Sequence, residues 1–285
     1  MRTLKYLSHS AKQLFDFSPE RFYLERLADV RPPERDKGLA AHVGTAFDFF
    51  VKESLGCTDM ERPIEFLQEG RQVFDAYRIT GALEEIQRQR DLSTSSEYEQ
   101  RLFAIRRGVP LVGYPDAVFH YDDFVLICDW KVKGYASRGT SPRPGYLALR
   151  DELSYQVKRH KKCDAICRHG LWIDATPFDV SNPKWAAQLA TYAILLNVAF
   201  NKPCIFQIEE LVFNRRGELR VATHRGQVDQ DYFHGLLNGY NSMWIAVRDG
   251  IFDAPTRAHL EKVAAAIAET SPQELEMSTP KYGGW

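Results

Sequence analysis

The sequence predicts an α/β fold, because segments with strand character and segments with helix character alternate along its 285 residues. Between residues 97 and 133, short apolar runs are separated by turn residues, which is typical of strands. Residues 39–55 place apolar side chains at helical spacing, and 184–200 is apolar nearly all round, as in a buried helix. We expect a single domain over residues 1–270 and a loosely held tail over 271–285.

The composition is that of an ordinary globular protein, with 44% hydrophobic residues, 26% charged residues and a net charge of −1. No apolar run approaches the roughly 20 residues that span a bilayer, and no signal-peptide core stands at the N-terminus. We therefore expect a cytoplasmic protein with no membrane partner. Five scattered cysteines argue against a disulfide framework. Cys163 and Cys167, near His160 and His169, leave zinc as an alternative, although no second cysteine pair stands at a ligand spacing.

The N-terminal third is predicted to be helical. Ser8 is a candidate helix N-cap, and Ser18 followed by proline is a stronger helix start. A charged linker with two prolines covers residues 31–37. In the helix that follows, 39–55, Asp48 lies at the edge of the apolar stripe, where a half-buried carboxylate needs a cation or hydrogen-bond donors.

The same patterns predict the rest of the chain. Strands are placed where apolar residues alternate between turn residues, and helices where they recur every three or four residues. The expected elements are helical segments in 61–90, strands within 97–133, a helix at 148–163, a short strand at 171–173, the buried helix 184–200, a hairpin at 204–224 turning at Asn214–Gly217, and helices at 230–248 and 256–268.

The centre of the chain, residues 111–133, carries the candidate chemistry. Asp129 and Lys131 share one face of a strand because they are two residues apart, and a hairpin could bring Asp116 beside Asp129. Two carboxylates and an ammonium group close together can hold a hard divalent cation and place a positive charge beside an attacking water. Charged residues at strand ends also give this pattern by chance. Further motifs elsewhere in the chain are therefore needed to support a metal site.

A basic segment follows directly. Residues 129–170 hold ten lysines and arginines against four acidic residues, which suits a polyanionic substrate, although a solvated loop is the alternative. The candidate substrate contacts are Lys133, Arg138, Lys158, Arg159, Lys161 and Lys162.

Pro115-Asp116 followed by Asp129-Trp130-Lys131 resembles the signature of the PD-(D/E)XK nuclease superfamily. Two further motifs, in the same order along the chain, resemble those of its RecB-like branch. Gly44 to Asp48 resembles the G-x-x-x-H motif, with aspartate in place of the metal-binding histidine. Gln188 to Tyr192 resembles the Q-x-x-x-Y motif, whose side chains assist the active site and the DNA. The resemblance covers roughly residues 5–200.

The resemblance implies a restriction-endonuclease-like core, a mixed four-stranded sheet flanked by helices, with added N- and C-terminal helices. It also implies a metal-dependent DNA nuclease of the exonuclease type, acting in recombination, repair or phage DNA processing. Mg²⁺ or Mn²⁺ is the expected cofactor. By resemblance, the metal ligands are Asp48, Asp116, Asp129 and the Trp130 carbonyl, and the other catalytic residues are Lys131, Gln188 and Tyr192.

Some relatives carry a four-cysteine iron–sulfur cluster, which we do not expect here, because Ser18 stands near the first cysteine position and no cysteine follows Cys204. DNA is the expected partner, with a recombination protein or a second copy of this chain as further candidates. The alternative functions are a catalytically silent nucleic-acid-binding protein of the same fold, and a different metal enzyme or a structural protein.

Overall fold

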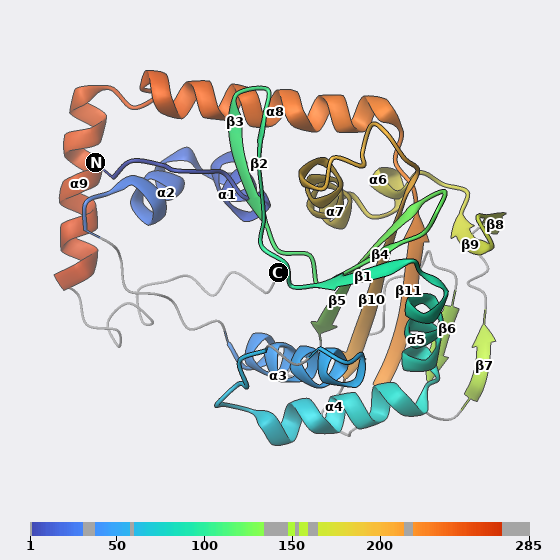
Figure 1. Cartoon of the computed structure of the whole chain (residues 1–285). Coiled ribbons are helices and arrows are strands. Elements are labelled where there is room, and N and C mark those ends of the chain that lie inside the picture. The colour runs from blue at the N-terminus through green and yellow to red at the C-terminus, as the bar shows by residue number, and fades with distance from the viewer. Residues whose placement is uncertain are drawn as a thin grey trace. The chain divides into compact units, whose positions relative to one another are not determined.

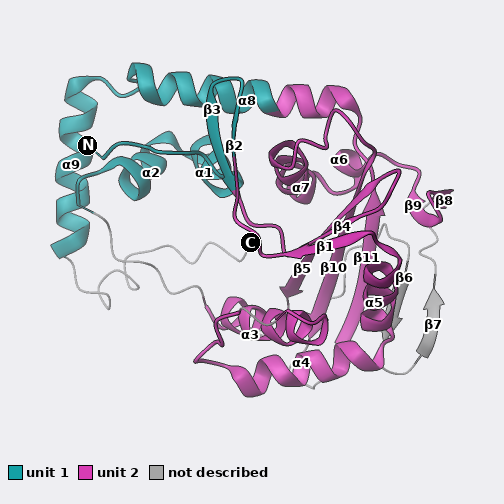
Figure 2. Ribbon diagram, in the orientation of Figure 1, with its two compact units in different colours: residues 1–36, 104–112, 237–285 teal, residues 37–103, 113–236 magenta. Residues whose placement is uncertain are grey.

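The computed structural model describes most of the chain, but for the strands β6 (Ala148–Asp151) and β7 (Ser154–Lys158) it describes the backbone alone. The described residues are 2–30, 38–57, 60–133, 148–151, 154–158, 165–213 and 219–269. The chain divides into two compact units, shown in Figure 2. Unit 1 comprises residues 1–36, 104–112 and 237–285, and unit 2 comprises residues 37–103 and 113–236.

Unit 2 is built on a mixed β-sheet that has seven strands in the described ranges, in the order β1-β4-β5-β10-β11-β6-β7. The central strands β5 and β10 are parallel, and the other described pairs are antiparallel. The strands are β1 (Ser95–Tyr98), β4 (Ala117–His120), β5 (Val125–Lys133), β6 (Ala148–Asp151), β7 (Ser154–Lys158), β10 (Cys204–Phe213) and β11 (Leu219–Gly226). A small hairpin of β8 (Ala165–Arg168) and β9 (Leu171–Asp174) forms a separate two-stranded sheet, and Arg225 of β11 donates a hydrogen bond to the Trp172 carbonyl of β9. The prediction of an α/β fold with a central mixed sheet is confirmed, and the sheet is larger than the four strands implied by resemblance.

Helices cover both faces of this sheet (Figure 1). The helices of unit 2 are α3 (Leu39–Ser54), α4 (Leu67–Ile79), α5 (Ala82–Leu92), α6 (Phe178–Ser181) and α7 (Pro183–Leu195). On one face, α3, α4 and α5 share a core with the even-numbered residues of β5, and Trp130 donates a hydrogen bond to Tyr77 of α4 at 3.4 Å. On the other face, the ring of Phe178 in α6 packs against Phe206 of β10 at 5.9 Å. Neighbouring residues of β5 therefore serve different layers.

The helices α3 and α4 approach each other closely at Gly70. A Cβ atom added to Gly70 would lie only 2.8 Å from the backbone carbonyl carbon of Ala46 and from the backbone nitrogen of Phe47, and closer still to the Ala46 side chain. Glycine at this position lets the two backbones meet. This contact fixes the part of α3 that immediately precedes Asp48.

Unit 1 contains the N-terminal helices and most of the two C-terminal helices, α8 (Gln230–Asp249) and α9 (Ala254–Glu269). The N-terminal elements are α1 (His9–Phe17), α2 (Pro19–Phe22) and a wider π-helical turn at Tyr23–Leu27. Both predicted caps are confirmed, since the Ser8 hydroxyl accepts a hydrogen bond from the Ala11 amide and the Ser18 hydroxyl from the Arg21 amide. The hairpin of β2 (Leu102–Arg106) and β3 (Val109–Gly113) belongs largely to this unit. None of the helices described here has the length and apolar character needed to cross a bilayer.

One secondary-structure prediction is wrong. The sequence predicts a helix at 148–163, but the described residues of this segment form the strands β6 and β7, which extend the sheet beyond β11. Arg220 of β11 pairs with Asp151 of β6, so the ladder of β11 supplies hydrogen bonds that outweigh any local helical preference. The hairpin expected at 204–224 is confirmed as β10 and β11, with its predicted turn outside the described residues.

Candidate active site

Three carboxylates lie in a row across neighbouring strands of the sheet in unit 2. Ala117 of β4 pairs with the last residue of β1 on one side and with Cys128 of β5 on the other. The adjacent positions are therefore Glu99, Asp116 and Asp129, one from each strand or its end. The register of the sheet thus places the first predicted carboxylate beside the second, as the predicted hairpin requires.

The backbone and side chains of β5 hold two of these acids. The amide of Trp130 donates a hydrogen bond to Asp116 Oδ2 at 2.9 Å. The Asp129 carboxylate is almost completely buried, with 2% of its side chain exposed, and forms an ion pair with Lys131. Lys131 points from the same face of β5 as Asp129, because alternate residues of a strand share a face. The Lys131 side chain is 27% exposed, so it is only partly buried.

Helix α7 contributes the two polar residues of the Q-x-x-x-Y pattern. Gln188 Nε2 donates a hydrogen bond to Asp129 Oδ1 at 3.0 Å and another to the Tyr192 hydroxyl at 2.9 Å. Four residues apart on a helix, the two side chains lie one above the other. A Cβ atom added at Gly113 would lie 2.8 Å from the Tyr192 ring, so glycine there leaves room for this tyrosine. The Asp129 carboxylate is therefore held by Lys131 on one side and by Gln188 on the other.

Helix α3 brings a fourth acid and a second lysine. Lys52 has no exposed side-chain surface, and its ammonium group forms an ion pair with Asp48 one turn earlier. The same ammonium donates to Glu99 Oε1 at 2.7 Å and lies 4.0 Å from Asp116 Oδ1. Asp48 is thus linked through Lys52 to the row of carboxylates.

The proximity of these acids changes their ionisation. Burial raises the pKa of Asp48 to about 8, and the neighbouring Asp116 carboxylate adds to that shift. Burial likewise raises the pKa of Asp129 to about 7, again with a contribution from Asp116. Burial alone would lower the pKa of Lys131 and of Lys52, but the surrounding carboxylates outweigh it and leave both pKa values raised. The site therefore carries an excess of negative charge that favours a proton or another cation.

The donor set suits a hard divalent cation. Carboxylate oxygens are the ligands that Mg²⁺ and Mn²⁺ prefer, and Asp48 Oδ1 is a buried oxygen with no hydrogen-bond partner among the described residues. In the described ranges, no three His, Cys, Asp or Glu side chains are arranged as a ready metal cage. The carboxylates are held instead by Lys52 and Lys131.

The predicted substrate contacts are only partly described. Lys133 donates to Glu210 Oε1 at 2.9 Å and lies 4.7 Å from the centre of the Trp185 ring, with 35% of its side chain exposed. Glu210 is itself buried and bonded to His224 of β11 at 2.9 Å. Lys158 lies in β7, where only the backbone is described. The residues that lie outside the description are Arg138, Arg159, Lys161 and Lys162, together with His160 and Cys163 of the zinc alternative.

Sequence reasoning missed Lys52 and Glu99. Lys52 stands four residues after Asp48, a spacing that predicts an ion pair on a helix, but its complete burial depends on the packing of α3 against the sheet. Glu99 follows the last residue of β1 and its side chain is 55% exposed, as expected of a solvated strand end, but it also accepts a hydrogen bond from Lys52. Its backbone adopts the left-handed conformation, with φ of 47°, which is unusual for a residue with a side chain and is often found at functional sites.

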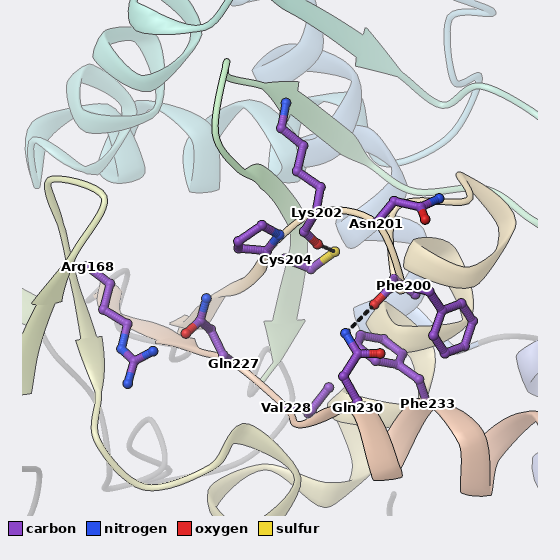
Figure 3. Close-up of a pocket in the computed structure, with 11 residues that line it drawn as sticks. Arg168, Phe200, Asn201, Lys202, Cys204, Gln227, Val228, Gln230 and Phe233 are labelled. Carbon is purple, nitrogen blue, oxygen red and sulfur yellow. Dashed lines mark hydrogen bonds between the residues drawn. The ribbon is translucent and has the colours of Figure 1, made fainter.

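A pocket of about 370 Å³ lies elsewhere in unit 2 (Figure 3). It is lined by residues around the start of β10, among them Arg168, Lys202, Gln227 and Gln230. Cys204, also in its lining, pairs with Val125, four residues before Asp129 on β5. At about 3.3 Å per residue, the pocket is separated from the carboxylates by roughly 13 Å along the strands. It is therefore not part of the candidate active site.

Comparison with known protein families and with curated proteins found no match. Among solved structures, the chain is similar to one from Eubacterium rectale described as a "Putative exonuclease", with a TM-score of 0.43 and 14% sequence identity. The match covers 93% of this chain and 88% of that chain. A likeness this slight does not bear on the chemistry of the carboxylate site.

Proposed function

We propose that the chain is a metal-dependent DNA nuclease of the RecB-like PD-(D/E)XK type, with exonuclease activity. The observation that carries this proposal is the convergence of Asp116, Asp129, Lys131, Gln188 and Tyr192, which are dispersed in sequence and match the motifs in order. A short motif alone is weak support, but its members meeting in the expected structural context is much stronger support.

Each residue has a role in phosphodiester hydrolysis. Asp116 and Asp129, with Asp48 and the Trp130 carbonyl, are the groups that would hold Mg²⁺ or Mn²⁺. When bound, such an ion supplies electrostatic stabilisation of the charge that develops on the phosphoryl group. Lys131, which forms an ion pair with Asp129, would orient the attacking water or stabilise the same charge.

The remaining residues position these groups and the substrate. Gln188 fixes the orientation of the Asp129 carboxylate through its hydrogen bond and is itself fixed by Tyr192. Lys133 presents a positive charge on the same face of β5 as Lys131, two residues further along the strand, where a DNA phosphate can reach it. The predicted contacts Arg138, Lys158, Arg159, Lys161 and Lys162 extend this proposal along the basic segment.

The test is incubation of the protein with linear duplex, circular duplex and single-stranded DNA, with and without Mg²⁺ or Mn²⁺. We expect metal-dependent degradation of linear DNA, sparing of circular DNA, and loss of activity in Asp116→Asn and Asp129→Asn. Asp122→Asn is a matched control, because Asp122 is an exposed acid in the turn between β4 and β5. Binding without cleavage under all conditions would favour the catalytically silent alternative, and neither binding nor cleavage would refute the proposal.

A further inference from the structure

The least ordinary residue of the candidate site is Lys52. Its side chain is completely buried, yet its ammonium group is surrounded by acids from three different parts of unit 2. Asp48 comes from α3, Glu99 from the end of β1, and Asp116 from the residue before β4. Burying an ammonium group raises the free energy of the folded state unless carboxylates compensate its charge. The acids around Lys52 therefore make this position favourable for a cation.

The net charge of the site indicates how many divalent ions it can hold. Four acids, Asp48, Glu99, Asp116 and Asp129, are gathered with two lysines, Lys52 and Lys131. When all are ionised, two negative charges remain, which a single divalent ion neutralises. A second divalent ion would leave two uncompensated positive charges beside the buried side chains of Lys52 and Asp129, which is unfavourable at low dielectric.

The positions of the acids around Lys52 also indicate a single divalent ion. Lys52 contacts Asp48 and Glu99 and approaches one oxygen of Asp116, while Asp129 is the neighbour of Asp116 on the opposite side. The space beside Asp48, Glu99 and Asp116 is therefore already taken by an ammonium group. Asp48 Oδ1, which has no hydrogen-bond partner among the described residues, remains for an added ion together with Asp116 and Asp129.

We propose that Lys52 is a built-in cation that takes the place of a second metal ion, so that this site binds one divalent ion per chain. Lys52 acts as a positioning residue, because it holds Asp48 and Asp116 in place without reaching the reacting atoms. The inference rests on the metal-dependent function proposed above. A purely structural lysine would stabilise α3 but would not set the number of metal ions bound.

The test is the stoichiometry of Mn²⁺ binding, measured by titration with electron paramagnetic resonance detection of free Mn²⁺, without DNA or turnover. We expect one Mn²⁺ per chain for the native protein and two for Lys52→Met, which keeps the bulk and flexibility of lysine without its charge. Lys12→Met is the matched control and should bind one, because Lys12 forms a similar ion pair with Asp16 four residues away on α1. Adding Asp48→Asn to Lys52→Met should return the count to one.

Each result has a definite meaning. Two Mn²⁺ ions on the native protein would overturn the role of Lys52 and leave the proposed nuclease intact, whereas no bound Mn²⁺ would overturn both. One Mn²⁺ on a folded Lys52→Met variant, checked by circular dichroism, would also overturn the inference. Lys52→Gln serves as the second variant if the methionine variant does not fold, with the same expected count of two.

Discussion

The contact between α3 and α4 at Gly70 provides a sensitive test of how the fold supports the site. Replacing Gly70 with alanine would place a methyl group 2.8 Å from backbone atoms of Ala46 and Phe47, where ordinary contacts begin at 3.4 Å. The two helices must therefore separate by roughly 0.6 Å or more, since backbone atoms cannot rotate away as side chains do. Overpacking of this kind costs about 1–3 kcal/mol.

A favourable change in helix propensity offsets part of this steric cost. Alanine is favoured over glycine inside a helix by about 1 kcal/mol, so the net loss of unfolding free energy for Gly70→Ala is about 2 kcal/mol at the upper end of the overpacking range. Gly235→Ala is the matched control, because Gly235 lies inside α8 and an added Cβ meets nothing within 4 Å. The control should gain up to about 1 kcal/mol, and the difference between the two variants isolates the steric effect.

Urea unfolding of both variants measures this difference. Because Asp48 follows Ala46 by two residues, the displacement should also reach the candidate site. A shift of about 1 Å can cost roughly 100-fold in rate, so a displacement of about half that size should slow DNA cleavage about tenfold. Equal changes in unfolding free energy for Gly70→Ala and Gly235→Ala would refute the steric reasoning, and normal cleavage by a destabilised Gly70→Ala would separate the helix contact from the site.

Three further predictions concern the charged groups. Lys131→Ala should lower single-turnover cleavage about 10²–10³-fold with little change in DNA affinity; a lower melting temperature with normal cleavage per folded molecule would indicate a structural lysine instead. Because burial and Asp116 raise the pKa of Asp48 to about 8 and that of Asp129 to about 7, the folded chain retains protons that the unfolded chain loses near the usual value of 3.8. The unfolding free energy of the metal-free protein should therefore fall as pH rises from about 4 to 8, and urea titrations in EDTA that show a rise would contradict this. Lys133→Ala should weaken DNA binding and reduce the slope of log affinity against log salt by about one, whereas an unchanged slope would exclude a phosphate contact.

Local sequence patterns predicted the parts of the candidate site that lie within one element. Asp129 and Lys131 share a face because a strand repeats every two residues, and Gln188 and Tyr192 meet because a helix brings every fourth residue together. The burial of Lys52 could not be predicted in this way. It depends on three elements that meet only in the folded chain, and its spacing to the neighbouring acid on α3 also occurs on many exposed helices.

The error at 148–163 has a similar cause. The segment becomes two strands because β11 presents an unpaired edge, and that edge lies about 70 residues further along the chain. The burial of the polar residues of β10 could not be predicted from local sequence patterns either. Glu209 and Glu210 are buried on opposite faces and are satisfied by Thr223 and His224 on β11, so the strand shows no alternation between apolar and polar positions.

The left-handed backbone of Glu99 has a consequence for how the molecule behaves at high concentration. β1 is an outer strand of the sheet and has only four residues, and the turn of the chain at Glu99 ends it. An outer strand offers unpaired backbone groups to any other extended chain, and a short one offers few. The turn that directs the Glu99 carboxylate toward Lys52 therefore also leaves β1 with only a short edge on which a second molecule could add a strand.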